Sequence, residues 1–278
     1  MTDMNSTASQ SSRVVAVTGA GTGIGRATAR AFAAEGAHVV AIGRRAEPLE
    51  QTAAGHDRIR PLAADITAEG EPDRILRTVL DTHGRLDVLV NNAGIVRGGA
   101  LGTLTPDMIG VQPATNLVAP ILLTQAALPL LETSSGVIAN GSTPVGQRAW
   151  PGSSVYAATK TALELLTRSW AVELAPRGIR VVAVAPGAID TPIGEHRGLT
   201  PERIAAVRGW HLAHTPLGRI GRPQEVAWAV TRLAAPAAAR RSPGSPHRPR
   251  RSSPEWYSRS TEGQSWRDRS GPGGGDGC

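Results

Sequence analysis

The feature that most constrains the fold is a strand, a glycine-rich turn and a helix that follow one another directly near the N-terminus. Val14–Val17 is a short apolar run, Thr18–Gly25 carries four glycines, and an Ala-rich helical stretch covers residues 26–35. The glycines of the turn let backbone amides approach a pyrophosphate, and Gly25 lets the helix pack closely on the strand. The order of these segments therefore predicts a dinucleotide whose phosphates face the helix N-terminus.

The rest of the chain alternates strands and helices. Further strands are predicted over Ala37–Ile42, Ile59–Ala64, Leu86–Asn91, Val137–Asn140 and Arg180–Ala185. Further helices are predicted over Glu71–Thr82, Pro106–Glu132, Ser153–Ala175 and Pro223–Ala235. Apolar strands that alternate with helices indicate a parallel sheet covered on both faces. We therefore predict a three-layer α/β/α Rossmann fold with a doubly wound parallel sheet, in which ligands bind beyond the carboxyl ends of the strands.

The residues after the second strand bear on the choice of nucleotide. This strand ends in Gly43-Arg44-Arg45. A Rossmann site that prefers NAD usually has an acidic residue here for the ribose hydroxyls, whereas a basic residue accommodates a 2′-phosphate. Arg44 therefore favours NADP(H) over NAD(H); the alternative is a solvated loop arginine in an Arg-rich chain.

A tyrosine and a lysine share a spacing that suits proton transfer. Lys160 is the only lysine of the chain and follows Tyr156, one of two tyrosines, by four residues. Residues at this spacing share one face of a helix, so both side chains can enter the same pocket. A nearby cation favours the phenolate, so we expect Lys160 to lower the pKa of Tyr156 and to let the phenol act as a general acid or base. The alternative is an ordinary surface lysine beside a half-buried tyrosine.

With these residues in view, the chain resembles the short-chain dehydrogenase/reductase family in its single-domain form, from Arg13 to about Ala239. The glycine turn matches TGxxxGxG, Asn91–Gly94 matches NNAG, and Tyr156–Lys160 matches YxxxK. Several motifs thus occur in the family's order. The resemblance implies that the following residues contact the cofactor: Thr18, Gly19, Gly21, Thr22, Gly23, Ile24, Gly25, Arg44, Asp65, Ile66, Asn92, Ala93, Gly94, Tyr156, Lys160, Pro186, Gly187, Ile189 and Thr191.

The resemblance also implies the catalytic residues. Asn116 matches the family's catalytic Asn, which holds a water in a proton relay with the lysine; the alternative is a buried Asn satisfied by backbone. Pro113, one turn earlier, costs a helix hydrogen bond and bends the axis. Counting back thirteen residues from Tyr156 gives Thr143 as the hydroxyl that holds the substrate oxygen, with Ser142 as the second choice.

The reaction implied is hydride transfer between the nicotinamide and a carbonyl or secondary alcohol carbon. Tyr156 would protonate the developing alkoxide, and Lys160 would bind the nicotinamide ribose. In the family, substrate choice is set by the segment that follows a Pro-Gly turn, here Pro186-Gly187. This segment covers residues 188–216 and contains Trp210, His211 and His214. The two histidines lack further plausible ligands, so no metal site is predicted.

The C-terminal segment departs from the family. Where the family has a VTG-like segment, a final strand and VDGG, residues 240–278 hold eight Arg, eight Ser, seven Gly and five Pro. We expect this tail to be disordered, because it cannot bury enough apolar surface. One hypothesis is a frameshift in a GC-rich gene, since reading one base earlier permits Val-Thr-Gly in place of Ser242-Pro243-Gly244. The last strand of the sheet would then be missing or altered, which weakens assembly.

Charge and composition set the remaining expectations. The tail contributes +4 of the net charge of +7, which leaves nonspecific nucleic-acid binding as a weaker hypothesis, without a reading motif. A third hypothesis is a damaged or non-catalytic relative that only binds cofactor. Residues 1–12 are expected to fray, no membrane-spanning run or signal segment is seen, and a cytoplasmic location is the default. The expected partners are a small carbonyl or alcohol substrate and, if the C-terminus permits, a second copy in a dimer or tetramer.

Overall fold

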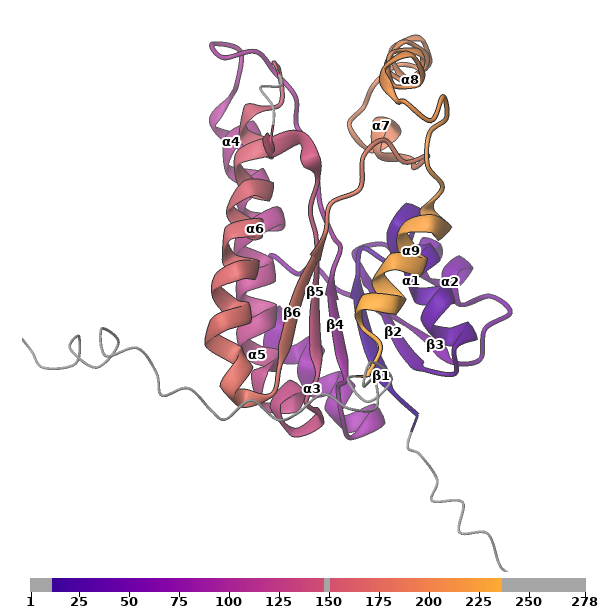
Figure 1. The fold of residues 1–278 in the computed structure, drawn as a ribbon, viewed down its shortest axis with the longest axis vertical. Coiled ribbons are helices and arrows are strands. Elements are labelled where there is room, and N and C mark those ends of the chain that lie inside the picture. The colour runs from indigo at the N-terminus through magenta and orange to yellow at the C-terminus, as the bar shows by residue number, and fades with distance from the viewer. Residues whose placement is uncertain (1–11, 148–150, 237–278) are drawn as a thin grey trace, which may run out of the picture. The chain divides into compact units, whose positions relative to one another are not determined.

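The computed structural model describes residues 12–147 and 151–236, and six parallel strands form the centre of this part of the chain (Figure 1). The strands are β1 (Val14–Thr18), β2 (His38–Gly43), β3 (Ile59–Ala63), β4 (Val88–Asn91), β5 (Val137–Gly141) and β6 (Arg180–Val184). Their order in the sheet is β3-β2-β1-β4-β5-β6. The predicted doubly wound fold is confirmed. The tail over 240–278 and residues 1–11 lie outside the described residues.

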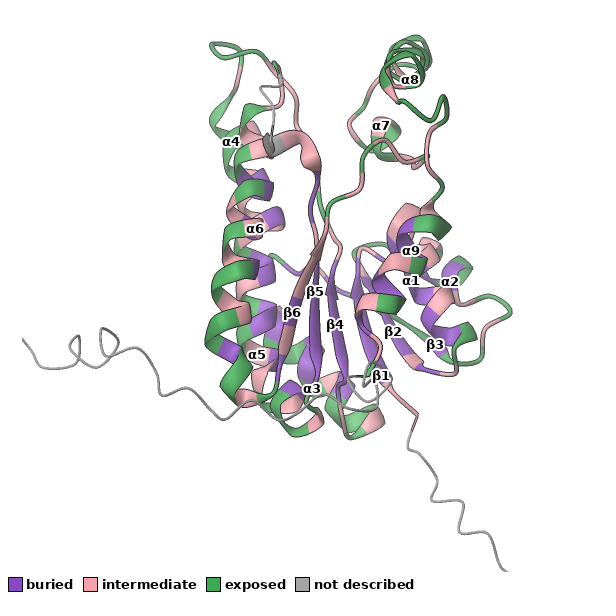
Figure 2. Ribbon diagram, viewed as in Figure 1, coloured by how far each residue is buried: buried purple, intermediate pink, exposed green. Residues whose placement is uncertain are grey.

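Helices cover both faces of the sheet, and the alternation of side chains along β1 shows how. Val14 and Ala16 belong to one buried cluster, whereas Val15 and Val17 belong to the other. The first cluster packs under α3 (Glu71–His83), α5 (Ala119–Ser134) and α6 (Ser154–Leu174). The second packs under α1 (Gly23–Ala34), α2 (Ala46–Ala53) and α9 (Pro223–Leu233). The four central strands, β2, β1, β4 and β5, are consequently the most buried elements, as Figure 2 shows.

The winding reverses between β1 and β4. These two strands pair directly, while the chain proceeds outward through β2 and β3 on one side and through β5 and β6 on the other. The loops after β1 and β4 therefore diverge at the carboxyl edge of the sheet, which is where open α/β sheets bind ligands.

The helix predicted over 106–132 is interrupted. It consists of α4 (Pro106–Pro113), a π-helical turn (Ala114–Val118) and α5. The π turn begins directly after Pro113, whose ring removes one backbone donor from the helix ladder. Asn116 lies in that turn and is fully buried. By length and hydropathy, Pro106–Ser134 is the one described segment that would suit a membrane span, but α5 packs its apolar side chains against the sheet.

Three helices were not predicted. They are α2, α7 (Ile193–His196) and α8 (Pro201–His214). Neither α7 nor α8 buries a residue, so no apolar periodicity marks either of them in the sequence. Figure 1 shows α8 and α4 on opposite sides beyond the carboxyl ends of the strands. Short 3₁₀ turns cover Pro144–Gln147 and Ala175–Arg177.

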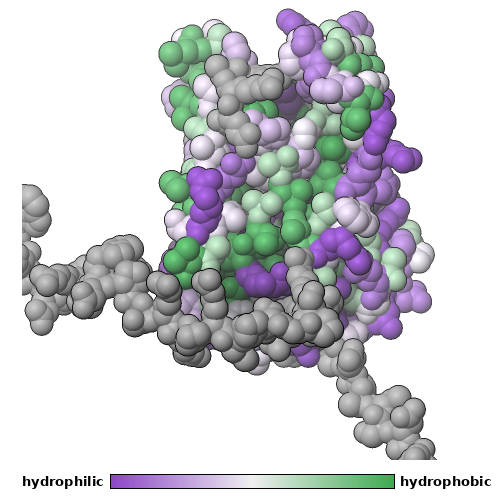
Figure 3. Space-filling view, viewed as in Figure 1, coloured by the Kyte–Doolittle hydropathy of each residue, from purple (hydrophilic) through white to green (hydrophobic). Residues whose placement is uncertain are grey.

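In the described chain, β6 pairs with β5 alone and forms an edge of the sheet. Val182 and Val184 are only half-buried on the face toward α9. Figure 3 shows apolar surface along this edge, between α6 and α9. The expectation that the last strand is missing or altered concerns the segment after α9, which lies outside the described residues.

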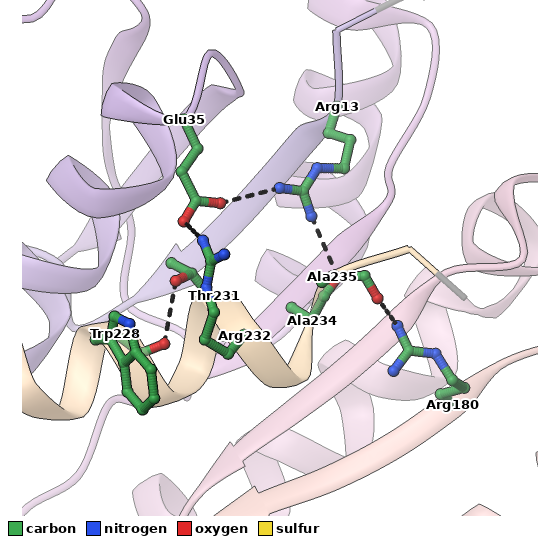
Figure 4. Close-up of polar contacts among 8 residues, drawn as sticks. All are labelled: Arg13, Glu35, Arg180, Trp228, Thr231, Arg232, Ala234 and Ala235. Atoms are coloured by element: carbon green, nitrogen blue, oxygen red, sulfur yellow. Dashed lines mark hydrogen bonds and ion pairs between the residues drawn. The ribbon is translucent and has the colours of Figure 1, made fainter. Parts of the chain in front are cut away.

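The C-terminal end of α9 is nevertheless held in place by side chains (Figure 4). Arg180 donates from Nη1 to the Leu233 carbonyl (2.8 Å) and from Nη2 to the Ala235 carbonyl (2.6 Å). Arg13 donates to the Ala234 carbonyl (3.2 Å). Cations at a helix C-terminus satisfy its free carbonyls and oppose its dipole. These contacts fasten α9 to β6 and to the residue before β1.

Candidate active site

A cavity of about 520 Å³ opens at the carboxyl edge of the sheet, at the predicted position. Sixteen of the nineteen residues predicted to contact cofactor line it: Gly19, Gly21, Thr22, Gly23, Ile24, Gly25, Arg44, Asp65, Ile66, Asn92, Ala93, Gly94, Tyr156, Lys160, Pro186 and Thr191. Thr18, Gly187 and Ile189 do not line it. Of the predicted catalytic residues, Ser142, Tyr156 and Lys160 line the cavity, whereas Asn116 and Thr143 do not.

The glycine turn is shaped for close approach. Gly19 has φ +65°, and a Cβ there would lie 2.8 Å from the Ala93 Cα. A Cβ at Gly25 would lie 2.2 Å from the Gly19 carbonyl oxygen. Neither site accepts a side chain. The Thr22 side chain makes no capping hydrogen bond at the start of α1, so the N-terminal amides of this helix are left for a ligand.

Thr18 acts from behind the cavity. Its hydroxyl accepts the backbone N–H groups of Asn92 and Ala93, each at 3.0 Å, and donates to the Val90 carbonyl. The Asn92 amide donates back to the Thr18 carbonyl at 2.8 Å. These bonds connect the loop after β4 to the loop after β1, so they fix the relative positions of the two loops that form the nucleotide site.

Arg44 and Asp65 lie together at the outer end of the cavity. The Asp65 carboxylate accepts the Thr67 hydroxyl (2.7 Å) and the Thr67 backbone N–H (3.0 Å). These two bonds lower the pKa of Asp65, and the nearby charge of Arg44 lowers it further. Arg44 itself is exposed, so its guanidinium is free to meet a phosphate at this end.

Lys160 is deeply buried at the opposite end of the cavity, with 4% of its surface exposed. Its ammonium donates to the Gly141 carbonyl at 2.8 Å, and burial lowers its pKa to about 8. A Cβ added to Gly94 would lie 3.3 Å from Lys160 Nζ and 3.4 Å from Asn116 Oδ1. The loop after β4, the π turn and α6 therefore converge here, and the bare backbone of Gly94 leaves room for the two side chains.

Tyr156 has a higher pKa than the sequence led us to expect. Burial of the phenol raises its pKa, while a hydrogen bond with the Thr143 hydroxyl and the positive charge of Arg197 act in the opposite direction. Lys160 is not among the groups that shift it. The expectation that Lys160 lowers the pKa of Tyr156 is therefore wrong for this structure, because the desolvation of the phenol outweighs the nearby charges.

The two candidate hydroxyls have different partners. The Thr143 hydroxyl is close enough to the Tyr156 phenol to oppose the rise in its pKa. Ser142 donates instead to Glu164 Oε1 at 2.6 Å, one turn along α6 from Lys160. Although Ser142 lines the cavity and Thr143 does not, the hydroxyl next to the phenol belongs to Thr143. This geometry favours Thr143 as the residue that holds a substrate oxygen.

The Asn116 side chain is engaged by protein groups. Its Oδ1 accepts the Ile95 N–H (2.8 Å), and its Nδ2 donates to the Ile95 carbonyl (2.9 Å) and to Thr159 Oγ1 (3.2 Å). This is the arrangement of a buried Asn satisfied mainly by backbone. Asn116 thus fixes the loop after β4, and Oδ1 keeps a lone pair for a further donor.

Arg197 is a residue of the cavity that the sequence did not reveal. It lies directly after α7, within the segment expected to set substrate choice, but that helix was not predicted. Trp210 and His214 of the same segment stack on each other at 4.1 Å between ring centroids and do not line the cavity. Among the described residues, no group of His, Cys, Asp or Glu is placed to hold a metal.

Comparison with known proteins identifies close relatives. Residues 13–201 match the short chain dehydrogenase family. The chain is 37% identical over 227 residues to 3-oxoacyl-[acyl-carrier-protein] reductase of Thermotoga maritima, covering 80% of this chain and 90% of that protein. It is 39% identical over 232 residues to 2-(R)-hydroxypropyl-CoM dehydrogenase of Xanthobacter autotrophicus, covering 80% and 91%. The crystal structure of 3-ketoacyl-(acyl-carrier-protein) reductase from Brucella melitensis, complexed with NADH, superposes with a TM-score of 0.75 at 31% identity, covering 82% and 92%.

Proposed function

Because the chain belongs to the short-chain dehydrogenase family and is an oxidoreductase acting on CH–OH or C=O groups with NAD(P), we propose that it prefers NADP(H) and uses Tyr156 as general acid and base. The observation that carries this proposal is that Tyr156 and Lys160, one helical turn apart on α6, line the same cavity as the glycine turn. The four-residue spacing of Tyr156 and Lys160 on α6 and their common cavity at the carboxyl edge of the sheet support this proposal.

The residues of the cavity fit a dinucleotide. The glycine turn excludes side chains where a pyrophosphate needs space, and α1 begins there with uncapped amides. Arg44 is the residue that would meet a 2′-phosphate, which supports NADP(H). When bound, the nicotinamide supplies or accepts the hydride.

In the reductive direction, Tyr156 donates its proton to the carbonyl oxygen of the substrate. The raised pKa keeps the phenol protonated at neutral pH, which suits a proton donor. Thr143 holds the same oxygen by its hydroxyl. Lys160, with a pKa of about 8, is largely protonated at neutral pH and uses one N–H on Gly141, which leaves two donors for the nicotinamide ribose.

We also propose that Asn116 takes part in a proton relay, as the similarity to the short-chain dehydrogenase family implies. The free acceptor capacity of Asn116 Oδ1 and its closeness to the Gly94 backbone, beside Lys160, support a water between the two side chains. Such a water would pass protons between Lys160 and solvent, so that Tyr156 is reprotonated after each turnover.

Replacing the phenol tests the proposal. Tyr156→Phe is expected to lower kcat for the reduction of a small ketone by at least about 100-fold, because general acid catalysis is worth roughly 10²–10⁴-fold. The NADPH dissociation constant should change little, since the ring remains. Unchanged reductase activity in this variant would show that the assigned acid is wrong. NADPH binding by the wild-type protein without turnover of any carbonyl compound would instead support the cofactor-binding alternative.

We also propose that the protein forms a homo-oligomer. Leu122 on α5 and Val172 on α6 are apolar side chains with 46% and 78% of their surfaces exposed. Leu165, one further exposed apolar residue of α6, extends this surface. Apolar side chains on exposed helix faces are typical of contacts between subunits.

A further inference from the structure

We propose that Arg197 binds an acidic group of the substrate, so that the protein acts on keto acids or hydroxy acids, or on their phosphonate or phosphate counterparts. This inference rests on the proposed function, because it takes Tyr156 as the residue beside the reacting oxygen. It goes further by naming the chemical class of the substrate.

Arg197 is placed beside the reacting centre. It follows α7 and lines the same cavity as Tyr156 and Ile95. Its positive charge acts directly on the Tyr156 phenol. A substrate whose carbonyl oxygen contacts Tyr156 therefore has this guanidinium within reach of its other end.

The Arg197 guanidinium is seated against bare backbone. A Cβ added to Gly98 would lie 2.6 Å from Arg197 Nη2, so any larger residue at 98 would displace the guanidinium. The Gly99 N–H donates to the Gly152 carbonyl at 3.0 Å, which ties this loop to the segment before α6. Arg97 Nη1 donates to the His196 carbonyl at 3.2 Å and fastens the end of α7 to the same loop. The loop after β4 thus packs against the guanidinium and holds the end of α7.

Arg197 lacks a counter-ion within the described residues. Its Nε is buried and has no hydrogen-bond acceptor there. Seven other described arginines form ion pairs with carboxylates, whereas no described carboxylate pairs with Arg197. Arg197 as a whole is half-buried, and its buried Nε lacks an acceptor. A planar oxyanion is the ligand that pairs best with the fork of donors of a guanidinium.

The charges around the cavity favour a substrate anion here. Arg97, Lys160 and Arg197 line the catalytic end, and the acidic residue of the lining, Asp65, lies at the other end beside Arg44. The cofactor phosphates are a less suitable partner for Arg197. Thr191 lies over the glycine turn, where a Cβ at Gly23 would be 3.1 Å from its methyl group, whereas Arg197 lies over Gly98.

The test compares three ketones that differ in the group beyond the carbonyl: 3-oxobutanoate, 2-oxopropylphosphonate and the neutral methyl 3-oxobutanoate. In the wild-type protein, kcat/KM with NADPH is expected to be at least about tenfold higher for an acidic ketone than for the ester. Arg197→Gln should lower kcat/KM for the acid by about 100-fold, or about 2.7 kcal/mol, and for the ester by no more than about threefold. The ratio of acid to ester cancels any effect of Arg197 on the pKa of Tyr156.

Two further variants sharpen the comparison. Arg197→Lys keeps the charge but loses the planar fork, so it should recover more activity with the phosphonate than with the carboxylate. Arg203→Gln removes an exposed arginine of α8 that does not line the cavity, and it should behave as wild type. NADPH affinity should stay within about threefold in Arg197→Gln; a larger loss would assign the guanidinium to the cofactor and overturn the proposal.

A binding measurement separates this inference from the proposed function. Butanoate should raise the melting temperature of the NADPH-loaded wild-type protein and of Tyr156→Phe, but not of Arg197→Gln, and butanamide should raise none of them. This result would support the acidic site even if no ketone were reduced. Equal losses for acid and ester in Arg197→Gln, or no difference between butanoate and butanamide, would show that Arg197 does not read an acid.

Discussion

At positions 142 and 143, neighbouring hydroxyls are directed to different tasks. Ser142 bonds the Glu164 carboxylate, whereas Thr143 bonds the Tyr156 phenol. From the sequence, the choice between Ser142 and Thr143 depended only on the number of residues before Tyr156. A loop longer or shorter by one residue would have reversed it. The backbone path around the end of β5 decides it.

Thr143→Val should therefore impair catalysis far more than Ser142→Ala. Loss of the Thr143 hydroxyl removes a donor to the developing oxyanion, and we expect kcat to fall by about 100-fold. Ser142→Ala should leave kcat within a few-fold, because its hydroxyl is committed to Glu164. Steady-state kinetics on one neutral ketone measures both. The reverse order of effects would return the role to Ser142.

Arg44 gives a second prediction at this scale. Arg44→Ser should weaken NADPH by at least about tenfold, because a charge-assisted bond to a 2′-phosphate is worth roughly 1.5–3 kcal/mol, and should leave NADH nearly unchanged. Titration of the melting temperature with each nucleotide measures the ratio. Arg203→Ser is the control, since Arg203 is exposed on α8 and does not line the cavity. A ratio that stays constant in Arg44→Ser would refute the preference for NADP(H).

Residue spacing predicted much of the site, but not its electrostatics. The four-residue interval between Tyr156 and Lys160 was enough to place both on one helix face. It could not show how deeply each is buried, and burial sets the direction of both pKa shifts. Arg197 was missed for a related reason: its cavity exists only after α7 folds back toward the loop after β4.

At the scale of elements, the strands were the easiest to predict. Both faces of the sheet are covered, so most of the strands are apolar runs, β3 with Arg60 and Pro61 being the exception, and the strand ends shift by at most two residues from those expected. The helices α7 and α8 bury nothing and left no periodic signal. The π turn was partly foreseeable, since Pro113 marks where the ladder is broken, but the change of helix type was not.

The docking of α9 depends on Arg180. Arg180→Met should lower the free energy of unfolding by about 2 kcal/mol, because two charge-assisted bonds to the Leu233 and Ala235 carbonyls are lost. Urea unfolding measures the difference. Arg203→Met, on exposed α8, should change it by less than about 0.5 kcal/mol. Equal stability of the Arg180 and Arg203 variants would mean that packing alone holds α9.

At the scale of the whole molecule, the body of the fold and the C-terminal segment make separate contributions. The residues assigned to cofactor and catalysis all precede β6 or follow it within a few residues, whereas the segment after 239 departs from the family. Sequence composition identified that departure directly, because residues 240–278 have few aliphatic side chains to bury.

Repairing the C-terminus should stabilise the protein. If the gene encodes VTG-like and VDGG-like residues in another frame, a chain that carries that translation after residue 239 should melt at a higher temperature and elute as a larger assembly than the present chain. Calorimetry and light scattering measure the two effects. Absence of those residues from both alternative frames would eliminate the frameshift hypothesis, and a repaired chain no more stable than the present one would show that the edge at β6 costs little.

The two edges of the described sheet differ in their protection against pairing with another molecule. At one edge, β3 carries Arg60 and Pro61, and the proline has no amide proton to offer a neighbouring strand. At the other, residues 181–184 of β6 are Val-Val-Ala-Val, with no proline or charge among them. Uncharged apolar edges of this kind are templates for intermolecular β-structure. We therefore expect self-association of this protein to begin at β6 and not at β3.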